Sequence, residues 1–403
     1  MPIHSNPLQN DRIVSLDMMR GFALFGIFVA NSVNFQFGLF PTPELHHLYP
    51  LGVFDRIAEI FILFFAKASF YTLFSFLFGY GMALLKERLE YRNLPFATIY
   101  WRRMFILLVI GFLHGLFIWD GDILFVYAMT AFIFYFFLKL KGRGLLIWSL
   151  LLLLLMASSI AGNEEESTTL LDEQLFSYSA AEKTVLSSGS YAATILFRLH
   201  SDPLGMGVIG DIILNVTSMI SVLGMFLLGA FVARKKWLED VTNHSAFIKR
   251  IWWMTLLIGF PCKLAYILHD SYQNEMLHTT VGGPMTAMFY ASSIALLAST
   301  EKGRALLQPL SYAGRLSFTN YLMQSIVFTT IFYGYGIGLF NKIGYFAGVL
   351  LVIGFFFLQV VVSTWWLRRF YVGPLEWVWR IGTYLRIPKL MRKASIQQAD
   401  HRE

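Results

Sequence analysis

The chain has 403 residues, of which 56% are hydrophobic and only 14% are charged. Soluble domains carry about 25% charged residues. This composition, with a mean hydropathy of +0.58, therefore excludes an ordinary soluble fold and predicts an all-α, polytopic membrane protein. The formal charge of +7 does not indicate nucleic acid binding, because the basic residues fall at the ends of apolar segments. The single cysteine excludes internal disulfides and cysteine-based zinc sites.

Ten apolar segments have roughly the 15 to 25 residues needed to cross a bilayer. Their predicted positions are 13–33, 58–85, 104–119, 122–138, 144–162, 207–232, 251–269, 284–300, 316–334 and 346–367. The first segment has no small-residue cleavage site, so we expect it to be a retained helix rather than a signal peptide.

Basic residues predict the orientation of the chain. All but six of the 32 lysines and arginines lie at the termini or in alternate connections. The six exceptions are Arg56, Lys67, Lys183, Arg198, Lys263 and Lys342. Because cytoplasmic loops carry an excess of lysine and arginine, we expect ten spans in a cell (plasma) membrane, with both termini in the cytoplasm. The "WDGD" turn and the loop 163–206 then lie outside.

We expect one transmembrane helical domain, residues 1–368, followed by a basic cytoplasmic tail, residues 369–403, that rests on anionic lipid. In the extracytoplasmic loop 163–206, "SGSYAATILFRL" favours a surface helix. The sequence gives no sign of paired broken helices or of an inverted repeat, which counts against a transporter.

The first apolar segment carries a polar stripe. Asp17 and Arg20 are three residues apart and share a helix face. Asn31 follows Arg20 by eleven residues, about three turns, and lies on the same face. An interfacial ion pair and an interhelical hydrogen bond would explain these residues without any function, so both interpretations stay open.

Lys67 is the least expected residue, because it lies in the middle of the apolar run "IFILFFAKASFYTLFSFLFGYGMALL". A lysine there needs a carboxylate partner or an anionic ligand. Glu59, two turns away, lies on the same side.

The stretch "GFLHGLFIWDGDILFVYAM" is a candidate catalytic site, because His114, Asp120 and Asp122 lie within nine residues of one another. A histidine beside a carboxylate is typical of a general base, and equally of a satisfied structural pair. His46 and His47 in the preceding outer loop are alternative bases. No ligand spacing supports a zinc site, and we expect no metal.

Asn320, Gln324 and Ser325 crowd one face of the ninth segment. Hydrogen bonds between helices explain them as well as a binding site does.

Several stretches together resemble the YeiB-like domain-of-unknown-function family (domain of unknown function 418) of bacterial membrane proteins. They are "RIVSLDMMRGFALFGIFVANSVNF", "FYTLFSFLFGYGMAL", "GFLHGLFIWDGDILFVYA", "YAGRLSFTNYLMQSIVFTTIFYGYGIGLF" and "GPLEWVWR", spread from residue 12 to 380. That family looks related to a wider superfamily of transmembrane acyltransferases, whose first helix carries an arginine followed eleven residues later by asparagine or histidine.

The resemblance implies an acyltransferase. An acyl donor, acetyl-CoA or another acyl-CoA, would dock on the basic pair Arg102 and Arg103, with Arg20 nearby, and Asn320 and Gln324 would complete the donor site. Its thioester would pass Lys67. His114 with Asp122, or His46 or His47, would activate a hydroxyl or amine of an extracytoplasmic glycan, lipid or small metabolite. Asn31 and Lys67 would stabilise the oxyanion.

Two other readings remain open at this level. One is a transporter or exporter of a small anionic or amphipathic solute, which a polar stripe fits equally well. The other is a sensor or scaffold. Glycine-rich helix faces allow a homodimer, and no nucleic acid partner is expected.

Overall fold

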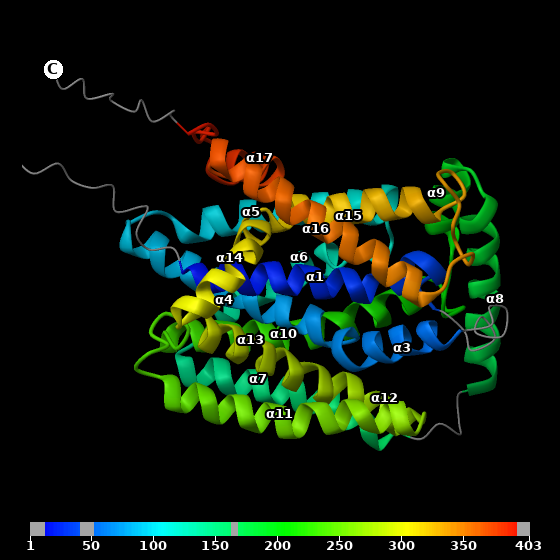
Figure 1. Ribbon diagram of the computed structural model, residues 1–403, viewed down its shortest axis with the longest axis horizontal. Coiled ribbons are helices and arrows are strands. Elements are labelled where there is room, and N and C mark those ends of the chain that lie inside the picture. Colours follow the sequence, from blue (N-terminus) through cyan, green and yellow to red (C-terminus); the bar gives the residue numbers. More distant parts are fainter. Residues whose placement is uncertain (1–12, 41–51, 163–167, 393–403) are drawn as a thin grey trace, which may run out of the picture.

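The computed structural model describes residues 13–40, 52–162 and 168–392, and within these ranges it contains helices and no named strand (Figure 1). This confirms the predicted all-α fold. The helices of the first half are α1 (Val14–Phe37), α3 (Val53–Phe61), the π-helical turn η1 (Ile62–Ala66), α4 (Ser69–Tyr91), α5 (Phe96–Phe117), α6 (Leu124–Phe137), α7 (Gly142–Ala157) and the 3-10 turn η2 (Ser158–Ala161).

The second half continues in the same way. Its elements are α8 (Thr168–Ser188), α9 (Tyr191–His200), α10 (Val208–Lys235), α11 (Ser245–Leu268), α12 (Tyr272–Leu277), the π-helical turn η4 (His278–Gly282), α13 (Gly283–Ala298), α14 (Glu301–Arg315), α15 (Ser317–Phe332), α16 (Tyr345–Arg369) and α17 (Pro374–Tyr384).

Each of the ten predicted segments falls on a helix. Eight stretches of the described chain are long and apolar enough to cross a membrane: Val14–Phe37, Val53–Tyr91, Phe96–Phe117, Gly142–Ala161, Val208–Lys235, Ser245–Leu268, Tyr272–Ala298 and Tyr345–Arg369. The other two predicted spans fall on α6 and α15, which have 14 and 16 residues. The number of spans and the cytoplasmic position of the termini stay predictions.

Helix α1 runs through the middle of the bundle and packs against α4, α14, α15 and α16 (Figure 1). Two of its contacts need glycine. A Cβ atom on Gly21 would meet the backbone of α14, and one on Gly314 of α14 would meet the backbone of α1. Helices α4 and α10 approach in the same reciprocal way through Gly79 and Gly229. These four glycines therefore allow helices of the same chain to pack closely against one another.

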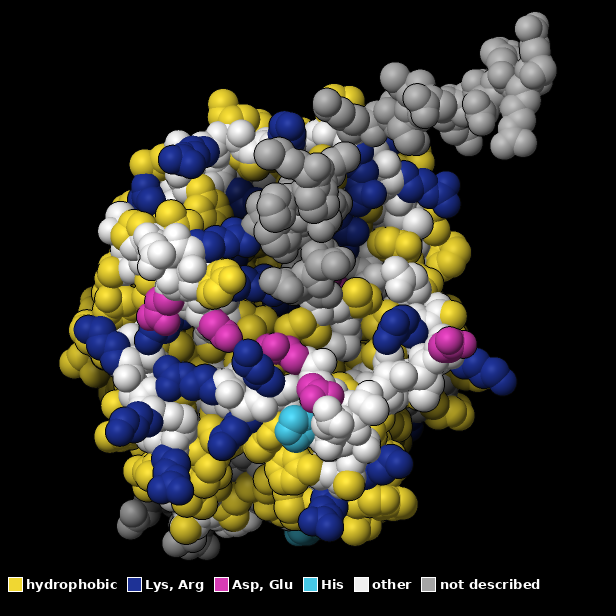
Figure 2. All heavy atoms as spheres, turned by 90° about the vertical axis from the view of Figure 1, so that its left-hand side faces the viewer, with side chains coloured by type: hydrophobic (Ala, Val, Ile, Leu, Met, Phe, Trp, Pro, Cys, Tyr) yellow, Lys and Arg dark blue, Asp and Glu magenta, His cyan; other side chains and the backbone are white. Residues whose placement is uncertain are grey.

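The bundle has one strongly basic end, which we call the basic end (Figure 2). It is formed by the ends of α4, α10 and α14 and by α17, and Figure 2 shows lysine and arginine side chains gathered over this face. The segment predicted as a tail returns to the bundle here. Helix α17 packs against α5 and α15, and Tyr371 and Arg392 join the two strand-like segments that flank it through hydrogen bonds to Leu390 and Arg369.

The opposite end is covered by α8 and α9, so we call it the capped end (Figure 1). The predicted surface helix exists as α9. Arg198 of α9 donates to the backbone oxygens of Leu116 and Ile118 at the end of α5. Tyr191 donates to the oxygen of Phe117. These bonds satisfy carbonyl groups that the end of α5 leaves without a helical partner.

One break in a long helix was not apparent from the sequence. The second apolar segment is interrupted between η1 and α4, where Ala68 has a left-handed backbone with φ of 62°. A second long helix passes through the π-helical turn η4 between α12 and α13. Neither Gly nor Pro lies at residues 67–68, so the sequence carries no breaker residue that would reveal the first interruption.

Candidate functional site

A cavity of about 670 Å³ lies among α1, α4, α5, α6, α15 and α17. Phe74 and Arg88 of α4 both line it, and fourteen residues of helix span about 21 Å. The cavity is therefore elongated along α4, from the basic end towards the middle of the bundle.

The wall of this cavity is strongly basic. Seven arginines line it, against two carboxylates. The arginines are Arg20, Arg88, Arg92, Arg103, Arg315, Arg380 and Arg386, and the carboxylates are Asp17 and Glu376. Guanidinium groups bind phosphate with two parallel hydrogen bonds. A cluster of this sign and composition indicates a ligand that carries several negative charges.

Further along α4 the wall becomes apolar and aromatic. The residues there include Ile27, Phe74, Leu77, Phe78 and Tyr127. The cavity thus has a charged part and an apolar part, which fits a ligand with a charged head and a long, less polar arm.

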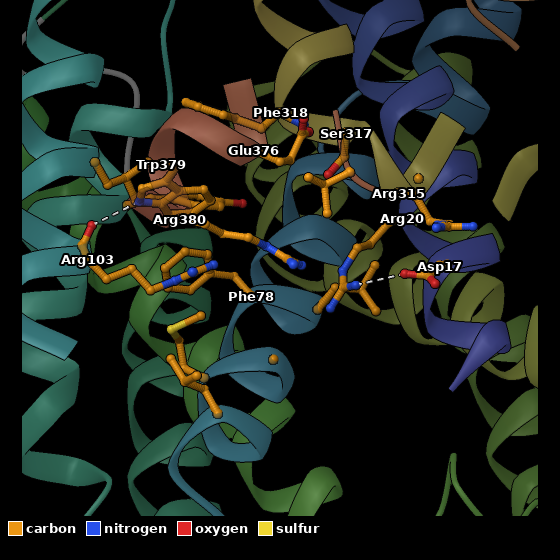
Figure 3. Close-up of a pocket in the computed structure, with 18 of the residues that line it drawn as sticks. Asp17, Arg20, Phe78, Arg103, Arg315, Ser317, Phe318, Glu376, Trp379 and Arg380 are labelled. Carbon is orange, nitrogen blue, oxygen red and sulfur yellow. Dashed lines mark hydrogen bonds and ion pairs between the residues drawn. The ribbon is translucent and has the colours of Figure 1, made fainter. Parts of the chain in front are cut away.

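Individual arginines are held in defined positions. Arg20 forms an ion pair with Asp17 at 3.0 Å, as predicted from their spacing. The guanidinium of Arg103 lies 3.9 Å from the centre of the Trp379 ring, and the indole N–H donates to the backbone oxygen of Arg103. In Figure 3, Arg20 and Arg380 extend toward one another across the cavity, and Arg103 lies beside Trp379.

Glu376 caps the start of α15, which forms part of the cavity wall. Its carboxylate accepts hydrogen bonds from the N–H groups of Phe318 and Thr319, at 2.9 and 3.0 Å, and from the Thr319 hydroxyl at 2.6 Å. A carboxylate at this position satisfies the free N–H groups of the helix start and interacts favourably with the helix dipole. Burial raises the pKa of Glu376.

The predicted pair of His114 and Asp122 is present. The Nδ1 atom of His114 lies 3.1 Å from Oδ1 of Asp122, and both side chains are 1% exposed. The contact is not well aligned for a hydrogen bond, and the Nε2 atom of His114 has no partner among the described residues. Asp122 also accepts from the N–H of Phe125 with its other oxygen.

A third side chain joins this pair. The hydroxyl of Tyr321 on α15 donates to Oδ1 of Asp122 at 3.0 Å, and the rings of Tyr321 and His114 lie 5.7 Å apart. Tyr321 lines the apolar part of the cavity, whereas His114 and Asp122 are not among the described lining residues. Tyr321 therefore connects the cavity to the His114–Asp122 pair.

The other predicted site residues lie elsewhere. Lys67 forms an ion pair with Glu275 at 3.1 Å, and Asn31 is half-buried on α1. Neither is among the described residues of the cavity wall, and the same is true of Arg102, although its neighbour Arg103 lines the cavity. His46 and His47 lie outside the described residues.

The polar face of α15 makes hydrogen bonds between helices. Asn320 donates to Ser363 of α16 at 3.0 Å. Gln324 donates to Gln359 at 2.9 Å, and Gln359 donates in turn to the backbone oxygen of Asn320. The arrangement is what helix packing requires, and neither Asn320 nor Gln324 is among the described cavity residues.

Several cavity residues were not identified as site residues from the sequence. They are Arg88, Arg92, Arg315, Arg380, Arg386, Trp379 and Tyr321. In the sequence the five arginines contribute only to the charge asymmetry of the loops. Among the described residues, no three His, Cys, Asp or Glu side chains gather as metal ligands would.

Similar proteins extend over nearly the whole chain. The chain is 36% identical to the uncharacterized protein YxaH of Bacillus subtilis, over 96% of this chain and 98% of that protein. It is 31% identical to an uncharacterized 39.9 kDa protein of Bacillus acidopullulyticus, over 95% and 97%. It is 27% identical to the uncharacterized protein YeiB of Escherichia coli, over 92% and 96%.

The model of the family described as "Protein of unknown function (DUF418)" matches residues 232–386, which include α14, α15 and α17 of the cavity wall. The apolar helices and the bacterial relatives indicate a multi-pass membrane protein. The resemblance found in the sequence motifs is confirmed, and the chain belongs to the DUF418 family, with YxaH and YeiB among its relatives.

Proposed function

We propose that the protein is a membrane-bound acyltransferase that moves an acyl group, such as acetyl, from acyl-CoA to a hydroxyl or amine on the other side of the plasma membrane. The observation that carries the proposal is the cavity whose arginines lie at the basic end and whose apolar part reaches Tyr321, which contacts Asp122 beside His114.

The two parts of the cavity suit the two parts of the donor. The phosphates of the coenzyme would bind to the arginines, of which Arg20, Arg103 and Arg380 extend into the middle of the charged part (Figure 3). The pantetheine arm would lie along the apolar wall of α4, over the roughly 21 Å that separates Arg88 from Phe74. The thioester would then be near Tyr321.

The three-residue cluster supplies groups for the reaction. His114 Nε2 takes the proton of the acceptor hydroxyl or amine, while Asp122 orients the ring and stabilises its protonated form. The acceptor atom forms a bond to the acyl carbon and the carbon–sulfur bond breaks. The proton passes from His114 to the departing sulfur, so free CoA leaves as a thiol. The Tyr321 hydroxyl donates to Asp122 and holds this carboxylate in place beside His114.

Transfer of label from acetyl-CoA tests this mechanism. Membranes from a bacterial strain that produces the protein are incubated with acetyl-labelled acetyl-CoA, and labelled glycans, lipids and small molecules are separated. We expect a labelled product with the wild type and with Arg102→Ala. We expect about a hundredfold less with His114→Ala, because general-base catalysis contributes roughly 10²–10⁴-fold. Full activity of folded His114→Ala would remove His114 from the mechanism.

A second candidate function is the transport of a small anionic or amphipathic solute. The break in the backbone at residues 67–68 favours it, because broken helices form the solute sites of many transporters. Uptake of a labelled anion by vesicles that contain the protein, without release of CoA from acetyl-CoA, would support this function over the first.

A further inference from the structure

The break between η1 and α4 contacts the helix that contains the π-helical turn η4. The hydroxyls of Ser69 at the start of α4 and Thr286 of α13 lie 2.7 Å apart. Gly283 packs so closely that a Cβ atom there would lie 2.8 Å from the backbone oxygen of Ala68. The break and the turn η4 therefore form one structural unit, bordered by α11.

The break in the first helix exposes backbone carbonyl groups that need donors, because lipid supplies none. Three ionisable side chains from the neighbouring helices provide them. His278 Nε2 lies 3.0 Å from the oxygen of Leu63 and the Tyr290 hydroxyl 2.9 Å from that of Phe65. The amine of Lys263 donates to the oxygen of Lys67.

Lys263 is the unusual member of this unit. Its side chain is wholly buried, and no described carboxylate lies within ion-pair distance of it. Lys67, whose carbonyl oxygen accepts from Lys263, also acts on it as a like charge, and His278 beside it is wholly buried as well. The Nδ1 atom of His278 has no partner among the described residues. A buried ammonium without a counter-ion is very unfavourable, so the amine is expected to be neutral at rest.

A polar route links this buried pair to the surface. The Lys67 ammonium lies 3.1 Å from the carboxylate of Glu275 and 5.1 Å from the ring centre of Tyr266. The side chains of Lys67 and Glu275 are 39% and 40% exposed. Glu59 and Asp270 add negative charge near Tyr266. Helix α7 and η2, which also pack here, contribute no charged side chain at this end.

We propose that Lys263 and His278 form a proton-binding site between the break after η1 and the π-helical turn η4, reached from the surface through Glu275 and Lys67. The bound species is a proton. It adds to the free electron pair of the neutral Lys263 amine or to Nδ1 of His278, and no covalent bond of the chain breaks. Protonation places a new positive charge beside Lys67 and next to the carbonyl at the break, and it thereby favours a different arrangement of the two helices.

Thermal unfolding in detergent at several pH values tests this site. Melting temperatures of the wild type, Lys263→Met and Lys263→Arg are measured between pH 6 and 9 by tryptophan fluorescence. Lys249→Met is the control, because Lys249 is an exposed lysine at the other end of the same helix. Proton uptake that opposes the native packing should lower the wild-type melting temperature as the pH falls, by about 1–2 °C per pH unit at the steepest point.

We expect this pH-dependent decrease in the wild type and in Lys249→Met, and its reduction by at least half in both Lys263 variants. Lys263→Arg keeps a donor for the carbonyl but holds a fixed charge, so its melting temperature should be low and should depend little on pH. Parallel pH profiles for all four proteins would overturn the proposal. A profile that vanishes when gluconate replaces chloride would overturn it as well, because the site would then bind an anion.

Discussion

Asp122 links His114 and Tyr321, because one of its carboxylate oxygens contacts both side chains. Its Oδ1 atom accepts from Tyr321 and lies 3.1 Å from His114. His114 and Asp122 are close because they are only eight positions apart in the sequence, on either side of the end of α5. Tyr321 comes from a helix almost two hundred residues later, and no local pattern indicates that its hydroxyl faces the turn after α5. Packing of α15 against α1 positions it.

At the same scale, Glu376→Ala removes a buried carboxylate that accepts three hydrogen bonds at the start of α15. We expect the variant to lose about 1–3 kcal/mol of stability, because the N–H groups of Phe318 and Thr319 lose their acceptor. Glu376→Gln keeps one acceptor oxygen and should lose less. Chemical or thermal unfolding in detergent measures both. Equal stability of Glu376→Ala and the wild type would show that the cap is dispensable.

At the scale of helices, most of the architecture could be predicted from apolar runs, because a helix that crosses lipid needs an unbroken apolar length. The interruption at Lys67 and Ala68 could not, since neither residue is a helix breaker. The exposed carbonyls are satisfied by Lys263, His278 and Tyr290, which lie about 200 residues later in the sequence. A lysine is accepted in this apolar run because the Lys67 side chain forms an ion pair with Glu275.

Close packing of α4 on α10 gives a second prediction. Gly229→Ala would bring a methyl group against the backbone of Phe76 and Tyr80, which neither helix can move aside. We expect a loss of about 1–3 kcal/mol from overpacking. Gly354→Ala is the matched control, because Gly354 also lies inside a helix but has open space around it. Melting temperatures of the two variants should differ clearly, and equal values would contradict the close contact.

At the scale of the whole molecule, the two ends of the bundle differ in charge and in how they are covered. The basic end collects arginines from α1, α4, α5, α14 and α17 into one cavity. Loop charges predict that these residues share one side of the membrane, but only the folded chain brings Arg20, Arg103 and Arg380 into one cavity wall, where Arg102 is not among the described lining residues. The capped end is closed by α8 and α9 above the turn that holds Asp122.

Glu182 at the capped end should make stability depend on pH. Its carboxylate accepts from the N–H of Leu39 and is buried, and burial raises its pKa to about 8. The unfolded chain has the ordinary value of 4.5. The folded state therefore binds the proton more tightly, and its stability should fall as the pH rises from about 4.5 to 8. Glu182→Gln should lack this part of the pH profile. If the two proteins lose stability in parallel over that range, Glu182 is not the titrating group.

Acetyl-CoA binding by calorimetry in detergent is the most direct test of the proposed donor site. Three proteins are compared: the wild type, Arg103→Ala and Arg102→Ala. The two variants remove adjacent arginines, of which only Arg103 lines the cavity. We expect micromolar binding by the wild type and by Arg102→Ala, and about 10- to 100-fold weaker binding by Arg103→Ala, the loss of one charge-assisted phosphate contact. Folded wild-type protein that binds neither acetyl-CoA nor longer acyl-CoAs would contradict the acyltransferase account.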